Sequence, residues 1–311
     1  MRLTAHAEPA LLDLLSALAR AGYRFVTPTP ATHARVLARP DRGQARDLRD
    51  AFGWSLPFAP DLLARDLLGS LEQAGLVVAE GALLRSRVRV ASLGERLFVH
   101  SAFPTDAEDA VFLGPDSYRF ADFVRAELPR AGQVRRLVDV GAGAGVGAIA
   151  AAPLLPGARL TLLDVNPLAL RFATVNARHA GLRVELVEGE GIEAASGLID
   201  LIIANPPYLM DEGDRTYRHG GDLHGARLSL DWTLAAARRL EPGGRMLLYT
   251  GSAIVGGRDA LRETLERTLP DLGCTLRYRE IDPDVFGEEL EKPAYAEVER
   301  IAVVGAVVAK E

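Results

Sequence analysis

The chain has 311 residues, of which 48% are hydrophobic and 25% charged, a composition typical of a globular protein with one large or two ordinary domains. Its formal net charge of −6 argues against a broad nucleic-acid-binding face. No apolar run approaches the roughly 20 residues that span a bilayer, and the start of the chain lacks a signal-peptide pattern. The single Cys274 excludes an internal disulfide and a cysteine metal cluster. We therefore expect a cytoplasmic protein with no membrane span and no metal site.

The first hundred residues are predicted to form a small α+β domain. Four stretches have the apolar spacing or end signals of helices: 11–18, 31–38, 44–52 and 60–74. Residues 76–79, a turn at Glu80-Gly81 and alternation through 83–90 then predict a β-ribbon, and 92–105 reads as another strand pair or a connector. Helices followed by a ribbon resemble a winged-helix module. We therefore expect residues 1–105 to be a substrate-recognition domain.

Residues 106–311 are predicted to form a second domain of the α/β class. A helix is expected over 117–128, and from Arg135 onward strands and helices alternate, which predicts a doubly wound parallel sheet. The expected strands are 136–140, 159–163, 183–187, 198–204 and 245–250. The expected helices are 146–152, 167–180, 227–240 and 259–269. Two late strands, 275–281 and 296–308, predict a terminal antiparallel hairpin.

A glycine-rich segment and an acid mark a nucleoside site. Residues 138–145 read VDVGAGAG, a strand that runs into a tight turn and opens a helix, so that a ligand can approach the backbone closely. Asp164 closes the next apolar strand, 19 residues after Gly145, where an acid accepts hydrogen bonds from both ribose hydroxyls. The alternative role for Asp164 is that of N-cap for a helix that begins at Pro167.

Two further acids favour S-adenosylmethionine over a nicotinamide cofactor. Asp139 precedes the glycines, where it would bind the ammonium of a methionine moiety, directly or through backbone and water. Glu190, in the loop after the third strand, would accept from the adenine amino group, although a solvated acid in a turn is the plain alternative.

The segment Asn205-Pro206-Pro207-Tyr208 follows the buried strand 198–204. Ligands of such sheets lie beyond the carboxyl ends of the strands. Two prolines fix φ and remove two backbone donors, so the loop is stiff and its carbonyls point outward. A carboxamide oxygen, the free Pro206 carbonyl and an aromatic ring on one turn form a clamp for a planar NH2 group. This pattern indicates methyl transfer to nitrogen.

With these motifs in this order, the chain resembles the class I S-adenosylmethionine-dependent methyltransferases, and more narrowly the amino-methyltransferases whose fourth strand ends in Asn-Pro-Pro-Tyr. It is most similar to the release-factor glutamine methyltransferase family and its relatives with a "small" methyltransferase domain. The resemblance covers residues 117–310, and the pair Gly220-Gly221 resembles a segment found in relatives. The helix-then-ribbon start departs from the all-helical N-terminal domain of the glutamine family, which puts the acceptor in doubt.

The resemblance implies a Rossmann-like, seven-stranded sheet, the cofactor S-adenosyl-L-methionine and the product S-adenosyl-L-homocysteine. The residues that it assigns to the cofactor are Asp139, Gly141, Ala142, Gly143, Gly145, Asp164, Val165, Glu190 and Asn205. Those assigned to catalysis are Asn205, Pro206 and Tyr208, with Pro207, Arg218 and His219 for the acceptor. His219 is otherwise an ordinary loop residue, and Phe120 packs either on the cofactor's methionine end or in the core.

The first choice of acceptor is a protein glutamine side-chain amide. The alternatives are an exocyclic amine of adenine or guanine in rRNA or DNA, and a small-molecule amine. The expected partner is thus a protein or RNA methyl acceptor. A non-catalytic cofactor- or RNA-binding protein and a nicotinamide oxidoreductase are the readings from other classes; the intact clamp at 205–208 argues against the first of these.

Overall fold

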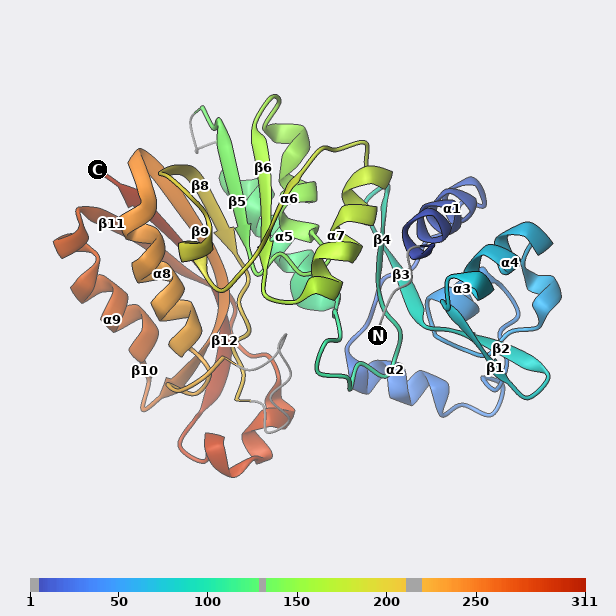
Figure 1. Ribbon diagram of the computed structural model, residues 1–311. Coiled ribbons are helices and arrows are strands. Elements are labelled where there is room, and N and C mark those ends of the chain that lie inside the picture. Colours follow the sequence, from blue (N-terminus) through green and yellow to red (C-terminus); the bar gives the residue numbers. More distant parts are fainter. Residues whose placement is uncertain (1–5, 129–132, 211–219) are drawn as a thin grey trace. The chain divides into compact units, whose positions relative to one another are not determined.

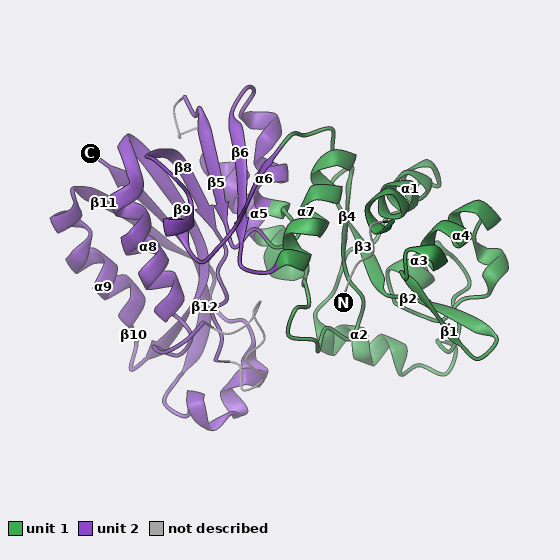
Figure 2. Ribbon diagram, viewed as in Figure 1, with its two compact units in different colours: residues 1–119, 143–146, 167–183 green, residues 120–142, 147–166, 184–311 purple. Residues whose placement is uncertain are grey.

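The computed structural model describes residues 6–128, 133–210 and 220–311 (Figure 1). The chain divides into two compact units, which Figure 2 shows in different colours. Unit 1 comprises residues 1–119, 143–146 and 167–183, and unit 2 comprises the remainder. The predicted boundary between residues 105 and 106 stays a prediction.

Unit 1 contains short helices and two β-ribbons. Its helices are α1 (Ala7–Arg20), α2 (Pro30–Leu37), α3 (Leu48–Phe52), α4 (Arg65–Gln73) and α7 (Pro167–His179). Its strands are β1 (Val77–Glu80), β2 (Leu83–Ser86), β3 (Val88–Leu93) and β4 (Arg96–Ser101). Of the leucines whose spacing predicted α1, Leu11, Leu14, Leu15 and Leu18 are buried and Leu12 is half-buried, so the expected helix is confirmed. The unit therefore has the predicted mixture of helices and ribbons.

Two local predictions in unit 1 differ from the structure. The single helix expected over 60–74 is divided into a 3₁₀ turn, Pro60–Leu62, and α4, because Leu63 and Ala64 are extended. The strand expected over 83–90 is divided at Arg87, where β2 pairs with β1 and β3 pairs with β4 instead. Periodicity alone does not reveal such a change of partner, since both pieces keep the same alternation.

Unit 2 is built on one mixed sheet. Its strands are β5 (Arg136–Val140), β6 (Arg159–Asp164), β7 (Glu185–Glu188), β8 (Ile199–Ala204), β9 (Leu240–Val255), β10 (Arg258–Asp259), β11 (Cys274–Asp282) and β12 (Arg300–Lys310). Among the described residues the strand order is β11-β12-β9-β8-β5-β6-β7, and the short β10 pairs with β9. Strands β5 to β9 run parallel to one another, whereas β12 is antiparallel to both β9 and β11. The doubly wound, Rossmann-like sheet with a terminal antiparallel pair is confirmed.

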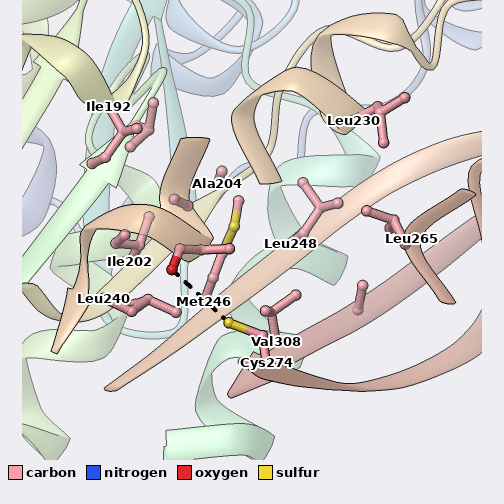
Figure 3. Close-up of a cluster of buried hydrophobic side chains, with 14 of the residues drawn as sticks. Ile192, Ile202, Ala204, Leu230, Leu240, Met246, Leu248, Leu265, Cys274 and Val308 are labelled. Carbon is pink, nitrogen blue, oxygen red and sulfur yellow. Dashed lines mark hydrogen bonds between the residues drawn. The ribbon is translucent and has the colours of Figure 1, made fainter. Parts of the chain in front are cut away.

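Helices cover both faces of this sheet. On one face, α8 (Arg227–Arg239) and α9 (Ala260–Thr268) pack on strands β5, β8, β9 and β12 through a continuous apolar cluster, part of which is drawn in Figure 3. The lone cysteine lies in this cluster, with the Cys274 thiol facing the carbonyl of Ala237. On the other face, Phe123 of α5 (Pro115–Glu127) lies against Gly305 of β12. Buried on both faces, the central strands are near-continuous apolar runs.

The order of the strands creates a switch point. The chain passes from β5 outward through β6 to β7, and then returns to the opposite side of β5 to form β8. Ligands of open α/β sheets bind at the carboxyl ends of the strands beside such a reversal. We therefore expect a ligand site at the residues that follow β5 and β8.

Candidate active site

The carboxyl ends of four parallel strands lie in one row. Val140 of β5 pairs with Leu163 of β6 on one side and with Ala204 of β8 on the other, while Asp164 pairs with Glu188 of β7. The next residue after each strand is therefore brought to the same edge of the sheet. Of the predicted site residues, Gly141, Asp164 and Asn205 meet there, and Glu190 follows in the loop after β7.

Asp139 is buried in the sheet just before this edge. Its side chain is 1% exposed, and its Oδ2 accepts a hydrogen bond of 2.8 Å from the backbone N–H of Ala148 in α6 (Val146–Ala151). Burial raises the pKa of Asp139 from its ordinary 3.8 to about 7, the Ala148 hydrogen bond opposes this shift, and the charge of Asp164 adds to it. A carboxylate in this position is stabilised when a cation approaches it.

The close packing around Asp139 requires a glycine at position 147. An added Cβ at Gly147 would lie 2.6 Å from the Phe120 ring and 2.8 Å from Asp139 Oδ2. Phe120 is itself buried, with its ring centroid 6.0 Å from that of Tyr249. The core-packing role weighed for Phe120 is thus present in the structure, whereas its contact with a cofactor stays a prediction.

The glycine-rich segment has the backbone that its sequence predicts. Gly141, Gly143 and Gly145 have φ of 68°, 54° and 79°, which L-residues rarely adopt. The N–H groups of Gly141 and Ala142 both donate to the carbonyl of Leu163, at 2.8 and 3.0 Å. The segment thus turns sharply away from the sheet, where its backbone can meet a ligand.

Asp164 ends β6 with a local turn. Its side-chain Oδ1 accepts a hydrogen bond of 2.9 Å from the N–H of Asn166, so the carboxylate begins the turn that leads into α7. Val165 beside it is 44% exposed, an apolar side chain at the edge where the nucleoside is expected. Glu190 is exposed and has the freedom of a solvated acid. The assigned roles of these three residues stay predictions.

The Asn205–Tyr208 loop leaves β8 at the same edge. Asn205 and Pro207 are half-buried, while Pro206 and Tyr208 are buried. The Tyr208 side chain is only 7% exposed, and its ring lies over Gly251, where an added Cβ would come within 2.3 Å of it. Its centroid is 5.9 Å from that of Phe286, at an interplanar angle of 64°. Most of the ring thus packs in the protein, and its stacking on an acceptor stays a prediction.

Gly220 and Tyr295, which are distant in sequence, form hydrogen bonds with the backbone just after Tyr208. The N–H of Gly220 donates to the carbonyl of Leu209 at 2.7 Å, and the N–H of Met210 donates to the Tyr295 hydroxyl at 2.7 Å. An added Cβ at Gly220 would lie 2.7 Å from the Pro207 carbonyl, so only glycine permits this approach. The predicted glycine pair therefore packs against the clamp. The predicted acceptor residues Arg218 and His219 lie outside the described residues.

Sequence reasoning did not select Trp232 or Tyr295. An added Cβ at Gly141 would lie 2.8 Å from the Trp232 ring, and one at Gly191 would lie 3.5 Å from its Nε1, so this indole of α8 lies under both loops assigned to the cofactor. Tyr295 belongs to the connection between β11 and β12, which packs on Tyr208 and Leu209 through an apolar cluster. Neither residue stands in a recognisable motif, and only the folded contacts reveal them.

The donor set fits a cationic nucleoside such as S-adenosylmethionine. A buried carboxylate with a raised pKa suits an ammonium group, a carboxylate at the end of β6 suits a ribose, and an exposed valine suits the face of an adenine. The positive φ at Gly141 makes the tight turn of this segment, and the Trp232 ring packs against it.

Comparison with known proteins identifies the same region. The family model "Methyltransferase small domain" matches residues 121–271. The chain is 34% identical over 168 residues to a release factor glutamine methyltransferase of Deinococcus radiodurans, covering 50% of this chain and 55% of that protein. It is 35% identical over 116 residues to a ribosomal RNA small subunit methyltransferase C of Ectopseudomonas mendocina, covering 37% of this chain and 32% of that one.

A third relative is named for a different acceptor. It is a 4-amino-L-phenylalanine/4-methylamino-L-phenylalanine methyltransferase of Streptomyces pristinaespiralis, 34% identical over 129 residues, with 37% of this chain and 44% of that protein covered. The chain thus spans about half the length, or less, of these relatives. No helix among the described residues has the length and apolarity to cross a membrane.

Proposed function

We propose that the protein is an S-adenosylmethionine-dependent N-methyltransferase, on the premise that residues 121–271 match the family model "Methyltransferase small domain". The observation that carries the proposal is the row of strand ends. Cofactor-type residues follow β5 and β6, and the Asn205–Tyr208 loop follows β8, the strand beside β5 at the switch point. A donor of methyl groups and a clamp for nitrogen would thus share one edge of the sheet.

The cofactor would be held by residues from three strand ends. Asp139 would meet the ammonium of its methionine end, Gly141 to Gly145 would line its path, and Asp164 would accept from the ribose hydroxyls. Val165 and Glu190 would meet the adenine on its face and at its amino group. When bound, the cofactor supplies an electrophilic methyl group on a sulfonium sulfur.

The acceptor nitrogen would be held by the clamp. Its lone pair is delocalised into a carbonyl or a ring, so it is a poor nucleophile until it is oriented. Hydrogen bonds from its NH2 to Asn205 Oδ1 and to the Pro206 carbonyl would fix the nitrogen and favour a more pyramidal geometry. Tyr208 would meet the acceptor plane with the small part of its surface that is not buried. Positioning of this kind supplies on the order of 7–11 kcal/mol, and no strong general base is needed, because the proton leaves a cationic nitrogen.

The acceptor that we favour is a protein glutamine amide. A primary amide offers the flat NH2 group that the clamp matches, and the relative in Deinococcus radiodurans is named for that acceptor. Charge supports the same choice. The segment from Asp282 to Glu299, which packs on the clamp through Phe286 and Tyr295, has seven acidic residues and one lysine. A net charge of −6 there would repel a polyanion.

The second candidate acceptor is a base amine in ribosomal RNA. The similarity to the ribosomal RNA enzyme of Ectopseudomonas mendocina, 35% identity over 116 residues, favours it. A free amine of the aminophenylalanine type is the third, on the similarity to the Streptomyces protein.

Transfer of a labelled methyl group separates these acceptors. The full chain is incubated with methyl-tritiated S-adenosylmethionine and, in parallel, with purified release factor, small ribosomal subunits and 4-amino-L-phenylalanine. We expect label in the release factor, located on a glutamine by mass spectrometry and absent with the Asn205→Ala variant. Label in RNA or in the amino acid would replace the glutamine assignment, and failure to bind S-adenosylhomocysteine at all would refute the proposed function.

A further inference from the structure

Asn176 lies in the C-terminal half of α7, and its buried side-chain amide makes three hydrogen bonds, none of them to its own helix. Its side chain is 1% exposed, and it belongs to unit 1 together with all of its partners. Its Oδ1 accepts from the N–H of Val99 at 2.8 Å, and its Nδ2 donates to the Val99 carbonyl at 3.0 Å and to the Ala144 carbonyl at 2.9 Å.

The two bonds to Val99 satisfy the edge of a ribbon. Val99 of β4 lies opposite Val90 of β3, and both its N–H and its carbonyl go to Asn176, so they face away from the β3 partner. In an antiparallel ladder such outward-facing groups belong to a non-hydrogen-bonded pair. Backbone donors and acceptors that are buried without partners at a strand edge destabilise the fold. At Val99 the side-chain amide of Asn176 makes the hydrogen bonds that a neighbouring strand would otherwise make.

The third bond reaches the predicted cofactor segment. Ala144 lies between Gly143 and Gly145, which are both predicted to bind the cofactor and both have positive φ. A glycine backbone does not hold such a turn by itself, because glycine loses more conformational freedom on folding than other residues. The bond from Asn176 to the Ala144 carbonyl therefore fixes the orientation of a peptide group that lies between two glycines.

We infer that Asn176 is a positioning residue for the cofactor, which holds the glycine-rich segment in its ligand-ready form by tying Ala144 to strand β4. The inference rests on the proposed function, since it takes the ligand to be S-adenosylmethionine. It also makes the cofactor segment depend on a strand of the N-terminal hundred residues.

Only a carboxamide fits these three partners. The site requires one acceptor, for the Val99 N–H, and two donors, for the carbonyls of Val99 and Ala144. Aspartate has the same shape but would turn its second oxygen toward two carbonyl oxygens, and alanine would leave all three backbone groups without a partner. The Asn176→Asp change keeps the volume of the side chain but removes its N–H donors. Its effect therefore reports the hydrogen bonds and not the packing.

The test compares two ligands on the full chain. On the proposed function, S-adenosylhomocysteine would reach the glycine-rich segment with its methionine end, whereas adenosine lacks that end. Dissociation constants for both are measured by calorimetry with the wild type, Asn176→Asp, Asn176→Ala and the control Thr174→Val. The control removes a hydroxyl on the same helix that bonds only to the Leu170 carbonyl. The melting temperature of each variant is measured in parallel.

Loss of the Ala144 anchor predicts at least a tenfold weaker affinity for S-adenosylhomocysteine in both Asn176 variants, with a change of less than threefold for adenosine. The control should bind both ligands as the wild type does. A purely structural role would weaken both ligands equally or leave both unchanged, and either result overturns the inference. If one Asn176 variant fails to fold, the ratio of the two affinities in the other decides. A wild type that binds neither ligand refutes the proposed function instead.

Discussion

The raised pKa of Asp139 makes cofactor affinity depend on pH. In the protein without ligand, burial raises the pKa of this carboxyl to about 7, so that it is half-protonated near neutrality. The proposed role of Asp139 is to meet the ammonium group of the cofactor, for which the ionised form is required. Affinity for S-adenosylhomocysteine should therefore rise with pH as Asp139 loses its proton.

The size of the effect follows from the fraction of the ionised form. With a pKa of about 7, roughly 10% of the protein is ionised at Asp139 at pH 6 and roughly 90% at pH 8. If only this fraction binds, the apparent dissociation constant at pH 6 is about tenfold larger than at pH 8. Binding below neutrality should also release a proton from the protein, which calorimetry in buffers of different ionisation enthalpy detects.

The matched variant is Asp139→Asn, which keeps an oxygen for the Ala148 N–H and has no charge to titrate. It should bind S-adenosylhomocysteine more weakly at pH 8 and with little dependence on pH. Stability gives a second readout. Because the folded pKa lies above the unfolded value of 3.8, the protonated carboxyl favours the fold at low pH, and this contribution, up to about 4 kcal/mol, is lost as pH rises through 7. A wild-type affinity that is flat between pH 6 and 8 would refute the reasoning.

Four other changes test the site and the fold. Asn205→Ala should lower turnover by about 100-fold or more, with a small loss of S-adenosylhomocysteine affinity by calorimetry; normal turnover removes the clamp from the mechanism. Tyr295→Phe should lower kcat about fivefold through the loss of one hydrogen bond of about 1 kcal/mol, without a change in cofactor affinity. In a Trp54→Phe protein, which leaves Trp232 as the single tryptophan, S-adenosylhomocysteine should alter the fluorescence emission; an unchanged spectrum places the ligand away from Gly141. Burial, with a contribution from the Arg89 charge, lowers the pKa of His33 to about 4, so stability should fall as pH decreases below 6.5, and His33→Gln should reduce that slope in denaturant titrations.

The sheet and its strand ends were predictable because their signals are local. Each parallel strand is an apolar run with a turn residue at its end, so Asp164 and Asn205 could be placed on strand ends from the sequence alone. The glycine-rich segment needed no tertiary information either, since positive φ at Gly141 is a property of the turn itself. The residues at the ends of β5, β6 and β8 therefore lie where the sequence pattern predicts them.

Contacts between distant segments were not predictable in this way. Tyr208 looks in the sequence like a ring that is free to stack, but it lies over Gly251 and beside Phe286, which come from β9 and from the connection after β11. Asn176 reads as an ordinary polar residue of an amphipathic helix until β4 and Ala144 are brought to it. Hydrophobic periodicity assigns a face to such residues but does not say which partner lies there.

Part of what holds the Asn205–Tyr208 clamp in place lies outside these four residues. Two prolines fix their own φ angles but offer no N–H, so hydrogen bonds from N–H groups of this stretch begin only after them. The structure holds this stretch through Gly220 and Tyr295, which bind the backbone at Leu209 and Met210. Tyr295 lies beyond residue 271, where the match to the family model ends. The proposed chemistry of methyl transfer would thus belong to the matched part of the chain, whereas the geometry with which the clamp would meet its acceptor is set in part by a segment that the family match does not include.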